Sequence, residues 1–202
     1  MKTETEKLAL LNEKTAGDYQ AFLYDCDGTL ADNMGAHKLS YKSVASRYGV
    51  DLNTDIIDEL AGWPTVLVVK AISEKYGVEL PETFASEKST EFFNEFIDNT
   101  KPVEFVAQHL INHAGKIKIG VVSGGSRKTV TKTLTVLGLL PYVEVLVCAG
   151  ETLQGKPFPD PFLEAARLLN VDPAKCMVFE DGDPGVQAAI AAGMDWVRVD
   201  HI

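Results

Sequence analysis

Short apolar runs recur along the chain from Tyr19 onward, and most of them end at a polar residue. They are four to six residues long and rich in Val, Ile, Phe and Tyr. This is typical of strands that are buried on both faces of a parallel sheet. We therefore expect five strands, at Ala21–Tyr24, Ile117–Val122, Val143–Val147, Cys176–Phe179 and Trp196–Val199.

Helical stretches separate the last four of these strands. We expect helices at Arg127–Leu137, Pro161–Leu169 and Pro184–Ala192. The residue after each stretch is Gly or Asn, and two stretches begin with Pro, which are common signals for the end and the first turn of a helix. Strands that alternate with helices predict an α/β fold with a doubly wound parallel sheet.

The stretch between the first two strands breaks this alternation. It contains four expected helices, at roughly His37–Tyr48, Thr54–Leu60, Val66–Tyr76 and Phe84–Ile97. The breaks between them fall at Gly49, Gly62, Pro64, Gly77 and Pro81. A simple crossover between parallel strands needs only about a dozen residues, so this longer stretch indicates a helical cap inserted into the core.

The expected boundaries divide the chain into three parts. The α/β core comprises residues 18–32 and 101–202, and the helical cap comprises residues 33–100. The linkers are expected near Ala31–Asn33 and Asn99–Lys101. Residues 1–17 carry many charges, unlike a signal peptide, and are expected to form an N-terminal arm or a short amphipathic helix.

Charge and cysteine content narrow the class of partner. The 202 residues include 29 acidic and 19 basic side chains, a formal net charge of −10. This argues against nucleic acid or an anionic membrane as partner, because both need basic surfaces. No apolar run approaches the roughly 18 residues of a membrane span. Cys26, Cys148 and Cys176 match no metal or disulfide pattern, so we expect a cytoplasmic location. We also expect the protein to be a monomer.

Four polar clusters stand directly after an expected strand or one loop beyond it. They are Asp25–Leu30, Ser123–Ser126, Gly155–Pro161 and Glu180–Gly185. Ligands of open α/β sheets bind outside the carboxyl ends of the strands, so we expect all four clusters to meet in one site. The nucleotide-binding patterns GxxxxGK[ST] and strand-anchored GxGxxG are absent from the sequence.

Each cluster suggests one kind of chemistry. Asp25 and Asp27 form either a reactive pair or an Asx turn, while Leu30 occupies the position where a calcium-binding EF-hand needs glycine. Ser123 opens a helix, where it binds an anion or serves only as an N-cap. Lys156 is held between glycine and proline, unless it is an ordinary surface lysine. The last cluster crowds three acids, which repel one another unless a divalent metal is present.

In this order the clusters resemble the four motifs of the haloacid dehalogenase superfamily, over nearly the whole chain from Tyr19 onward. The resemblance implies a Rossmann-like core in which Asp25 attacks phosphorus and becomes an aspartyl phosphate. Asp27 resembles the general acid and base. Related dehalogenases lack this carboxylate and phosphonate hydrolases carry a small residue there, so Asp27 indicates phosphoryl transfer.

The same resemblance implies roles for the other motif residues. Ser123 would hold a phosphoryl oxygen, Lys156 would neutralise the nucleophile and the phosphate, and Thr29 and Gly124 would contact the substrate. The implied ligands of Mg²⁺ are Asp25, Asp27 (through its backbone carbonyl), Asp181 and Glu180.

The expected cap resembles the small-cap branch that contains β-phosphoglucomutase and fructose-1-phosphatase-like enzymes. His37 matches its hinge histidine and Lys88 its cap lysine, unless both are ordinary residues on helix surfaces. Trp63 either stacks on a sugar or packs between helices. Thr65 stands where the mutases carry an arginine that grips a second phosphate, which favours the phosphatases.

The sequence thus predicts a Mg²⁺-dependent phosphatase that hydrolyses a small sugar phosphate, such as fructose 1-phosphate, through an aspartyl phosphate. A mutase of the β-phosphoglucomutase type is the first alternative. A non-catalytic phosphate-binding protein is the second, although binding alone does not require both Asp25 and Asp27. The expected partner is a small phosphorylated metabolite.

Overall fold

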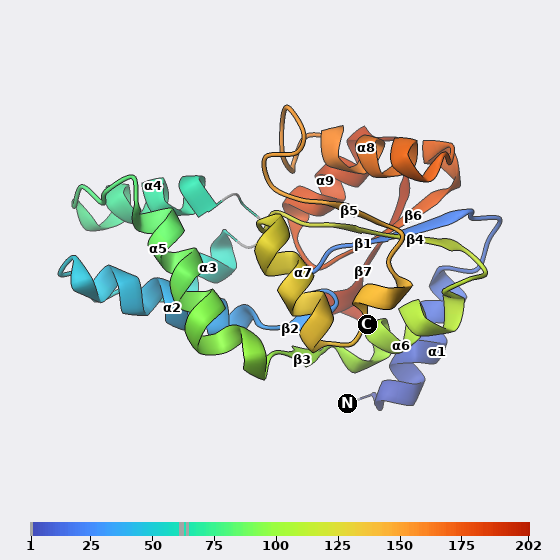
Figure 1. Cartoon of the computed structure of the whole chain (residues 1–202), viewed down its shortest axis with the longest axis horizontal. Helices are drawn as coiled ribbons and strands as arrows, with labels where there is room; N and C mark the ends of the chain where they lie inside the picture. Colours follow the sequence, from blue (N-terminus) through green and yellow to red (C-terminus); the bar gives the residue numbers. More distant parts are fainter. Residues whose placement is uncertain (1, 61–62, 64) are drawn as a thin grey trace.

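The computed structural model describes residues 2–60, 63 and 65–202. Within them, five parallel strands form one sheet in the order β5-β4-β1-β6-β7 (Figure 1). The strands are β1 (Ala21–Tyr24), β4 (Lys118–Val122), β5 (Val145–Val147), β6 (Cys176–Glu180) and β7 (Asp195–Arg198). Each lies within two residues of an expected strand. The predicted α/β fold class is therefore confirmed.

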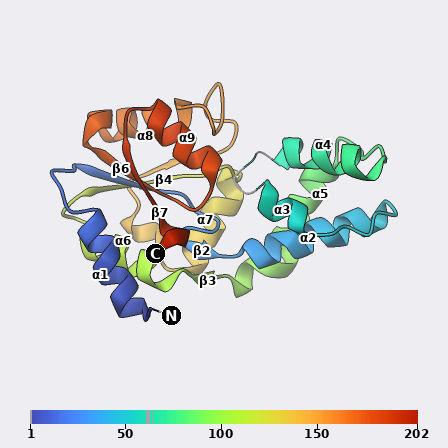
Figure 2. The same cartoon turned by 180° about the vertical axis from the view of Figure 1, so that it is seen from behind.

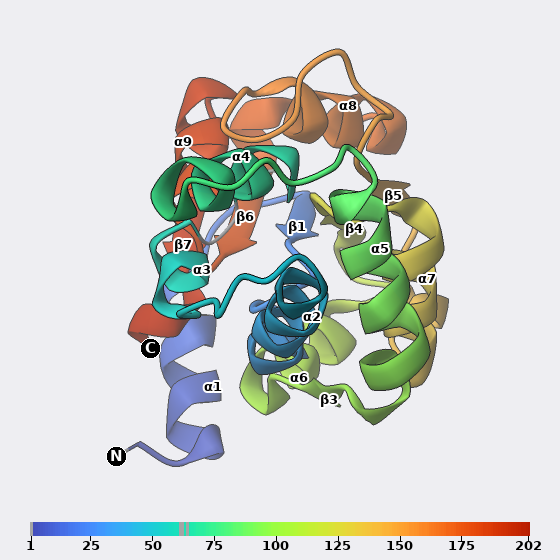
Figure 3. The same ribbon diagram turned by 90° about the vertical axis from the view of Figure 1, so that its left-hand side faces the viewer.

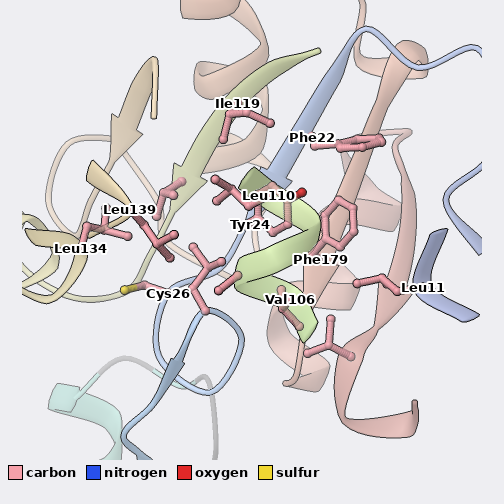
Figure 4. Packing of buried hydrophobic residues seen from close by; sticks show 14 of the residues in the cluster. Leu11, Phe22, Tyr24, Cys26, Val106, Leu110, Ile119, Leu134, Leu139 and Phe179 are labelled. Atoms are coloured by element: carbon pink, nitrogen blue, oxygen red, sulfur yellow. The ribbon is translucent and has the colours of Figure 1, made fainter. Parts of the chain in front are cut away.

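Helices cover both faces of the sheet (Figures 1 and 2). One face carries α1 (Glu4–Lys14), α6 (Glu104–His113) and α7 (Arg127–Val136), and the other carries α8 (Asp160–Leu169) and α9 (Asp183–Ala191). Side chains of a strand alternate between its two faces, so Phe22 and Tyr24 of β1 pack on the first face and Leu23 packs on the second. Figure 4 shows the core on the first face.

Helix α6 and a short antiparallel pair of strands are not among the expected elements. The pair consists of β2 (Ala31–Asp32) and β3 (Lys101–Pro102), with Asp32 opposite Lys101. Strands of two residues carry no periodic signal. Helix α6 does carry one, because Phe105, Val106 and Leu110 share its buried side, at the spacing of an amphipathic helix.

Four helices lie together at one end of the sheet (Figures 1 and 3). They are α2 (Met34–Arg47), α3 (Asp55–Glu59), α4 (Thr65–Tyr76) and α5 (Phe84–Glu91). They share a hydrophobic core that includes Val44, Ile72 and Phe84. We call residues 33–100 the cap, and its boundaries stay a prediction, as do those of the core. Gly62 and Pro64, expected between two cap helices, lie outside the described residues.

The fourth cap helix is shorter than expected. Its α-helical part ends at Glu91, and the chain continues as a π-helical turn at Phe92–Phe96 and a 3₁₀ turn at Ile97–Asn99. In the π turn, Phe92 stacks on His37 of α2, while Phe93 lies 4.2 Å from the Lys128 ammonium of α7. The turn thus directs neighbouring aromatic rings to different partners.

Residues 4–14 form helix α1, which begins with a capping box between Thr3 and Glu6. The Glu4 carboxylate accepts a hydrogen bond from the backbone N–H of Phe105 at the start of α6. Leu11 is fully buried against the sheet. The segment is therefore a docked helix rather than a loose arm. In the described part of the chain, no helix is both long and apolar enough to span a membrane.

Candidate active site

The carboxyl end of the sheet brings the four polar clusters together. Asp25 follows β1, Ser123 follows β4, Glu180 ends β6, and Lys156 lies in the loop between β5 and α8. These residues line one pocket, together with Asp27, Asp181, Gly124 and several side chains of the cap. The pocket lies beside β1, where chain connections leave toward both edges of the sheet, which is the usual ligand position in such folds.

Lys156 is the central cation of this pocket. Its Nζ donates hydrogen bonds to Asp25 Oδ1 at 2.7 Å, Glu180 Oε1 at 2.6 Å and the backbone oxygen of Val122 at 2.8 Å. These bonds use all three ammonium protons. Burial disfavours its charge, but the carboxylates of Asp25 and Glu180 outweigh burial and raise the pKa of Lys156. Lys156 is therefore a fixed positive charge beside Asp25.

Asp25, Glu180 and Asp181 form a group of acids in which one oxygen from each lies within 4.8 Å of the others. Burial raises the pKa of all three carboxyl groups, and the repulsion between Asp25 and its neighbours adds to this effect. Hard oxygen ligands that crowd negative charge suit Mg²⁺. The donor set therefore fits a divalent cation.

Two glycines allow this crowding. Gly28 has a φ of +88°, and a Cβ on it would lie 2.1 Å from Asp181 Oδ2. A Cβ on Gly185 would lie 1.9 Å from the carboxyl carbon of Glu180. Thr29, an expected substrate contact, donates its hydroxyl proton to Asp181 Oδ1 at 2.9 Å, so it orients an acid of the cluster, and its contact with substrate stays a prediction.

The carboxylate of Asp27 points to the cap side of the pocket. Its Oδ1 accepts a hydrogen bond from Asn33 Nδ2 at 2.6 Å and lies 3.4 Å from His37 Nε2. Burial would raise the pKa of Asp27, but His37, Asn33 and the charge of Lys88 together lower it. Before substrate binds, Asp27 is therefore an ionised carboxylate, which is the form of a base.

Lys88 and His37 form the cap's contribution to this polar group. Lys88 Nζ donates to His37 Nδ1 at 2.6 Å, which leaves the ring proton on Nε2, facing Asp27. Phe92 stacks on His37 with ring centroids 4.0 Å apart, and the Lys88 ammonium lies 4.7 Å from the ring centroid of Tyr41. Lys88 is only 6% exposed, so neither residue is an ordinary surface side chain.

Ser123 and Gly124 line the pocket from the core. The Ser123 hydroxyl accepts a hydrogen bond from the Gly125 N–H at 3.0 Å, and Ser126 caps helix α7. Such a helix start attracts anions through its free N–H groups. Thr65 and Trp63 line the pocket from the cap, and the Trp63 side chain is 44% exposed.

Asn33, Tyr41 and Phe92 contact the polar residues of the site and are absent from the expected set. Asn33 is a polar side chain that is only 2% exposed, at the start of the first cap helix. Its position in a linker beside the Asp27 cluster was a usable signal. Tyr41 and Phe92 look like ordinary core aromatics in the sequence, and only the packing of α2 against the end of α5 brings Tyr41 to Lys88 and Phe92 to His37.

Replacement of Lys88 by Met is expected to weaken substrate binding and stabilise the fold. Burial lowers the pKa of Lys88 from its usual value near 10.5 to about 8, a cost of about 3 kcal/mol for the charged form. Because the unfolded chain binds more protons between these values, stability rises with pH in that window and is lowest below pH 8. Thermal unfolding at pH 7 should therefore show a higher midpoint for Lys88→Met.

If Lys88 contacts the substrate as the sequence predicts, the same variant is expected to raise KM about tenfold, since a charge-assisted hydrogen bond to the substrate would be lost. In the wild type KM should rise above pH 8, as Lys88 loses its proton, and the variant should lack this rise. Lys70→Met, on the exposed side of α4, is the matched control. A KM for Lys88→Met equal to that of the control contradicts a substrate contact.

A parallel sheet with acids and a buried lysine at its carboxyl end, facing a helical cap, defines a capped α/β hydrolytic enzyme. The chain belongs to the haloacid dehalogenase-like hydrolase family, whose model matches residues 22–199. The predicted family and its fold are thereby confirmed. The match begins within β1, so helix α1 precedes it.

Named relatives agree with this membership. The chain is 34% identical over 182 residues to fructose-1-phosphate phosphatase YqaB of Escherichia coli K12, covering 90% of this chain and 96% of that protein. It is 27% identical over 180 residues to a phosphorylated carbohydrates phosphatase of Thermotoga maritima, covering 87% and 82%. The crystal structure of a β-phosphoglucomutase from Clostridium difficile superposes with a TM-score of 0.77 at 27% identity, covering 89% and 84%.

Proposed function

We propose that this phosphoric monoester hydrolase removes the phosphoryl group from a small sugar phosphate, such as fructose 1-phosphate, with Mg²⁺ as cofactor. The observation that carries the proposal is Lys156, whose ammonium bridges Asp25 and Glu180 beside Asp181. A carboxylate next to a buried cation and a metal-type acid cluster is suited to attack on a phosphate dianion. The expected cytoplasmic location and monomeric state stay predictions.

Asp25 is the proposed nucleophile. Its oxygen attacks phosphorus and the alcohol leaves, so that a covalent aspartyl phosphate replaces one slow hydrolysis by two displacements. Lys156 offsets the repulsion between carboxylate and phosphate, and the Ser123 hydroxyl with the N–H groups of the Gly124 loop receives the phosphoryl oxygens. Asp25, Asp181, Glu180 and the Asp27 carbonyl would hold Mg²⁺, which would supply further positive charge at the phosphate.

Asp27 is the proposed acid and base. Because a bound phosphate dianion adds negative charge near its carboxylate, the pKa of Asp27 rises on substrate binding. The protonated acid can then donate to the leaving oxygen. After the alcohol departs, the carboxylate receives a proton from the water that attacks the aspartyl phosphate. Asn33 and His37 hold it in place for both steps.

The cap side of the pocket supports a sugar monophosphate. Lys88 offers one cation there, while Thr65 replaces the arginine implied for mutases and the segment Asp51–Tyr76 contains no arginine. Trp63 is exposed and lines the pocket, as expected of a ring that stacks on a sugar. The Escherichia coli relative is named for fructose 1-phosphate, which supports this substrate first.

The rival activity is that of a phosphoglucomutase, favoured by the structural likeness to a β-phosphoglucomutase. A mutase must hold a sugar bisphosphate while it turns over and must exclude water from the aspartyl phosphate. Among the described cap residues that line the pocket, Lys88 is the only lysine or arginine, so we expect water to reach the intermediate first.

Incubation with fructose 1-phosphate is expected to release one phosphate for each substrate consumed. In parallel, β-glucose 1-phosphate with a bisphosphate primer should yield no isomer, because Thr65 stands where the mutases carry an arginine for the second phosphate. Free phosphate and sugar products are measured over the same time course. A wider panel of phosphorylated metabolites ranks other substrates. Isomer that forms faster than phosphate contradicts the phosphatase.

A further inference from the structure

A fully buried hydrogen-bond chain connects helix α1 to the strand of the nucleophile. Tyr24 of β1 bonds through its hydroxyl to His109 Nδ1 at 2.8 Å. His109 Nε2 bonds to the Thr15 hydroxyl at 2.9 Å, and that hydroxyl donates to the backbone oxygen of Leu11 at 2.8 Å. The side chains of Tyr24 and His109 are 0% exposed, and none of these residues reaches the pocket.

The hydrogen bonds that join Tyr24, His109 and Thr15 have defined donors and acceptors. Thr15 uses its only hydroxyl proton for Leu11, so its oxygen accepts the proton of His109 Nε2. His109 Nδ1 therefore carries no proton and accepts the one from the Tyr24 hydroxyl. Every buried donor and acceptor in the chain is satisfied by a neutral imidazole. Burial agrees with this, because it lowers the pKa of His109 to about 3, with a smaller contribution from His113 nearby.

Tyr24 links this chain to the catalytic carboxylates. Its ring stacks on Phe179, its partner in the sheet, with centroids 4.2 Å apart and planes 17° apart, and Figure 4 shows the two side by side. The ring centroids of His109 and Phe179 lie 5.0 Å apart. The residues that follow these two rings are Asp25 and Glu180, the two carboxylates that share Lys156.

We propose that His109 is a positioning residue that sets the places of Asp25 and Glu180 through the Tyr24–Phe179 stack, and that Thr15, at the end of α1, completes its hydrogen bonding. This proposal rests on the proposed function only for its expected effect on kcat. The hydrogen bonds and the ring stack that carry it do not depend on which substrate is bound. Helix α1, which the family match does not include, thereby becomes a support of the active site rather than a passive extension.

Kinetics test the proposal with Tyr24→Phe and Thr15→Val, each of which removes one hydroxyl from the chain. Both are expected to lower kcat about tenfold, because small misplacements of reacting groups are costly, with KM within about twofold of wild type. Thr15→Ser keeps the hydroxyl and should restore kcat. Thr135→Val is the matched control, because Thr135 makes the same bond to a carbonyl four residues earlier at an exposed position.

All assays are run well below the unfolding midpoint of each variant, measured by circular dichroism. Wild-type kcat in both Tyr24→Phe and Thr15→Val would overturn the proposal. A rise in KM with kcat unchanged overturns it as well, since the substrate contacts lie elsewhere. If Thr15→Val fails to fold, Tyr24→Phe carries the same test.

Nuclear magnetic resonance separates this proposal from the proposed function. The ¹⁵N spectrum of His109 should show a neutral ring with its proton on Nε2 between pH 5 and 9. The amide signals of Asp25 and Glu180 should shift in Thr15→Val, return in Thr15→Ser and stay unchanged in Thr135→Val. A proton on Nδ1, or unshifted amides in Thr15→Val, overturns the proposal. If no phosphate ester is hydrolysed, the proposed function fails, and these signals still test the positioning role of His109.

Discussion

Asp25→Asn is expected to lower kcat by a factor of about 10⁴ or more, as the loss of a nucleophile does in other covalent enzymes. The amide oxygen of Asn still accepts the proton of Lys156, and the backbone N–H of residue 25 still bonds to Phe179. The variant should therefore keep its fold, which circular dichroism checks. What it loses is the charged oxygen that forms the bond to phosphorus.

A trapped adduct identifies the atom involved. With Mg²⁺, fluoride and beryllium, the wild type should form a fluoroberyllate on Asp25, seen by ¹⁹F resonance, and Asp25→Asn should form none. Asp18→Asn, which removes an exposed carboxylate paired with Lys175, is the control and should behave as wild type. More than a few per cent of activity in Asp25→Asn rules out the covalent mechanism.

Chelation of divalent cations is expected to silence the enzyme, and added Mg²⁺ should restore full activity. Asp25, Glu180 and Asp181 repel one another without a cation, and the phosphate adds further negative charge. Ca²⁺ should inhibit, because its longer and looser coordination suits an in-line attack poorly. Activity that survives exhaustive chelation contradicts the metal site.

Thermal unfolding tests the same site without catalysis. Burial and Asp25 raise the pKa of Asp181 to about 7, so the folded chain binds more protons than the unfolded chain between about pH 4 and pH 7. The stability of the metal-free protein therefore falls as pH rises from about 4 to about 7. Asp181→Asn, which resembles the protonated acid, should stabilise the metal-free protein at pH 7.5.

Mg²⁺ should raise the wild-type unfolding midpoint, because at 100 times its Kd it adds about 2.7 kcal/mol to the free energy of unfolding. Asp181→Asn should lose most of this rise. Asp58→Asn, which removes an exposed carboxylate of α3, is the control and should retain it. An equal rise in both variants places the cation elsewhere.

The sequence is most informative where function and fold depend on the same few residues. The apolar run Ala21–Tyr24 followed by Asp25 marks both a buried strand and its reactive end. The same holds for Cys176–Glu180. In contrast, α6 is not among the expected elements, because it directly follows the expected linker, although its buried side has helical spacing. The shortening of the last cap helix at Phe92 depends on which partners Phe92 and Phe93 meet, and neighbouring residues do not reveal that.

Roles that depend on contacts between distant segments were the hardest to predict. The resemblance implies that Thr29 contacts substrate, which stays a prediction, but no local pattern predicts that its hydroxyl bonds to Asp181, 152 residues away. Likewise His109 lies 85 residues from Tyr24 and 94 from Thr15. No local pattern distinguishes such a histidine from one on a helix surface. Only the meeting of α1, α6 and β1 determines its role.

The pairing of β2 with β3 has a consequence for how selectivity can change in this family. The chain enters the cap after Asp32 and leaves it before Lys101, and these residues are partners in one antiparallel pair. Insertions are tolerated best where their two ends lie close together. We therefore expect that a segment of different length can replace the cap between these two points without disturbing the carboxylates at the end of the sheet. If the proposed cap contacts hold, such a replacement changes which alcohol is accepted and leaves the phosphate chemistry the same.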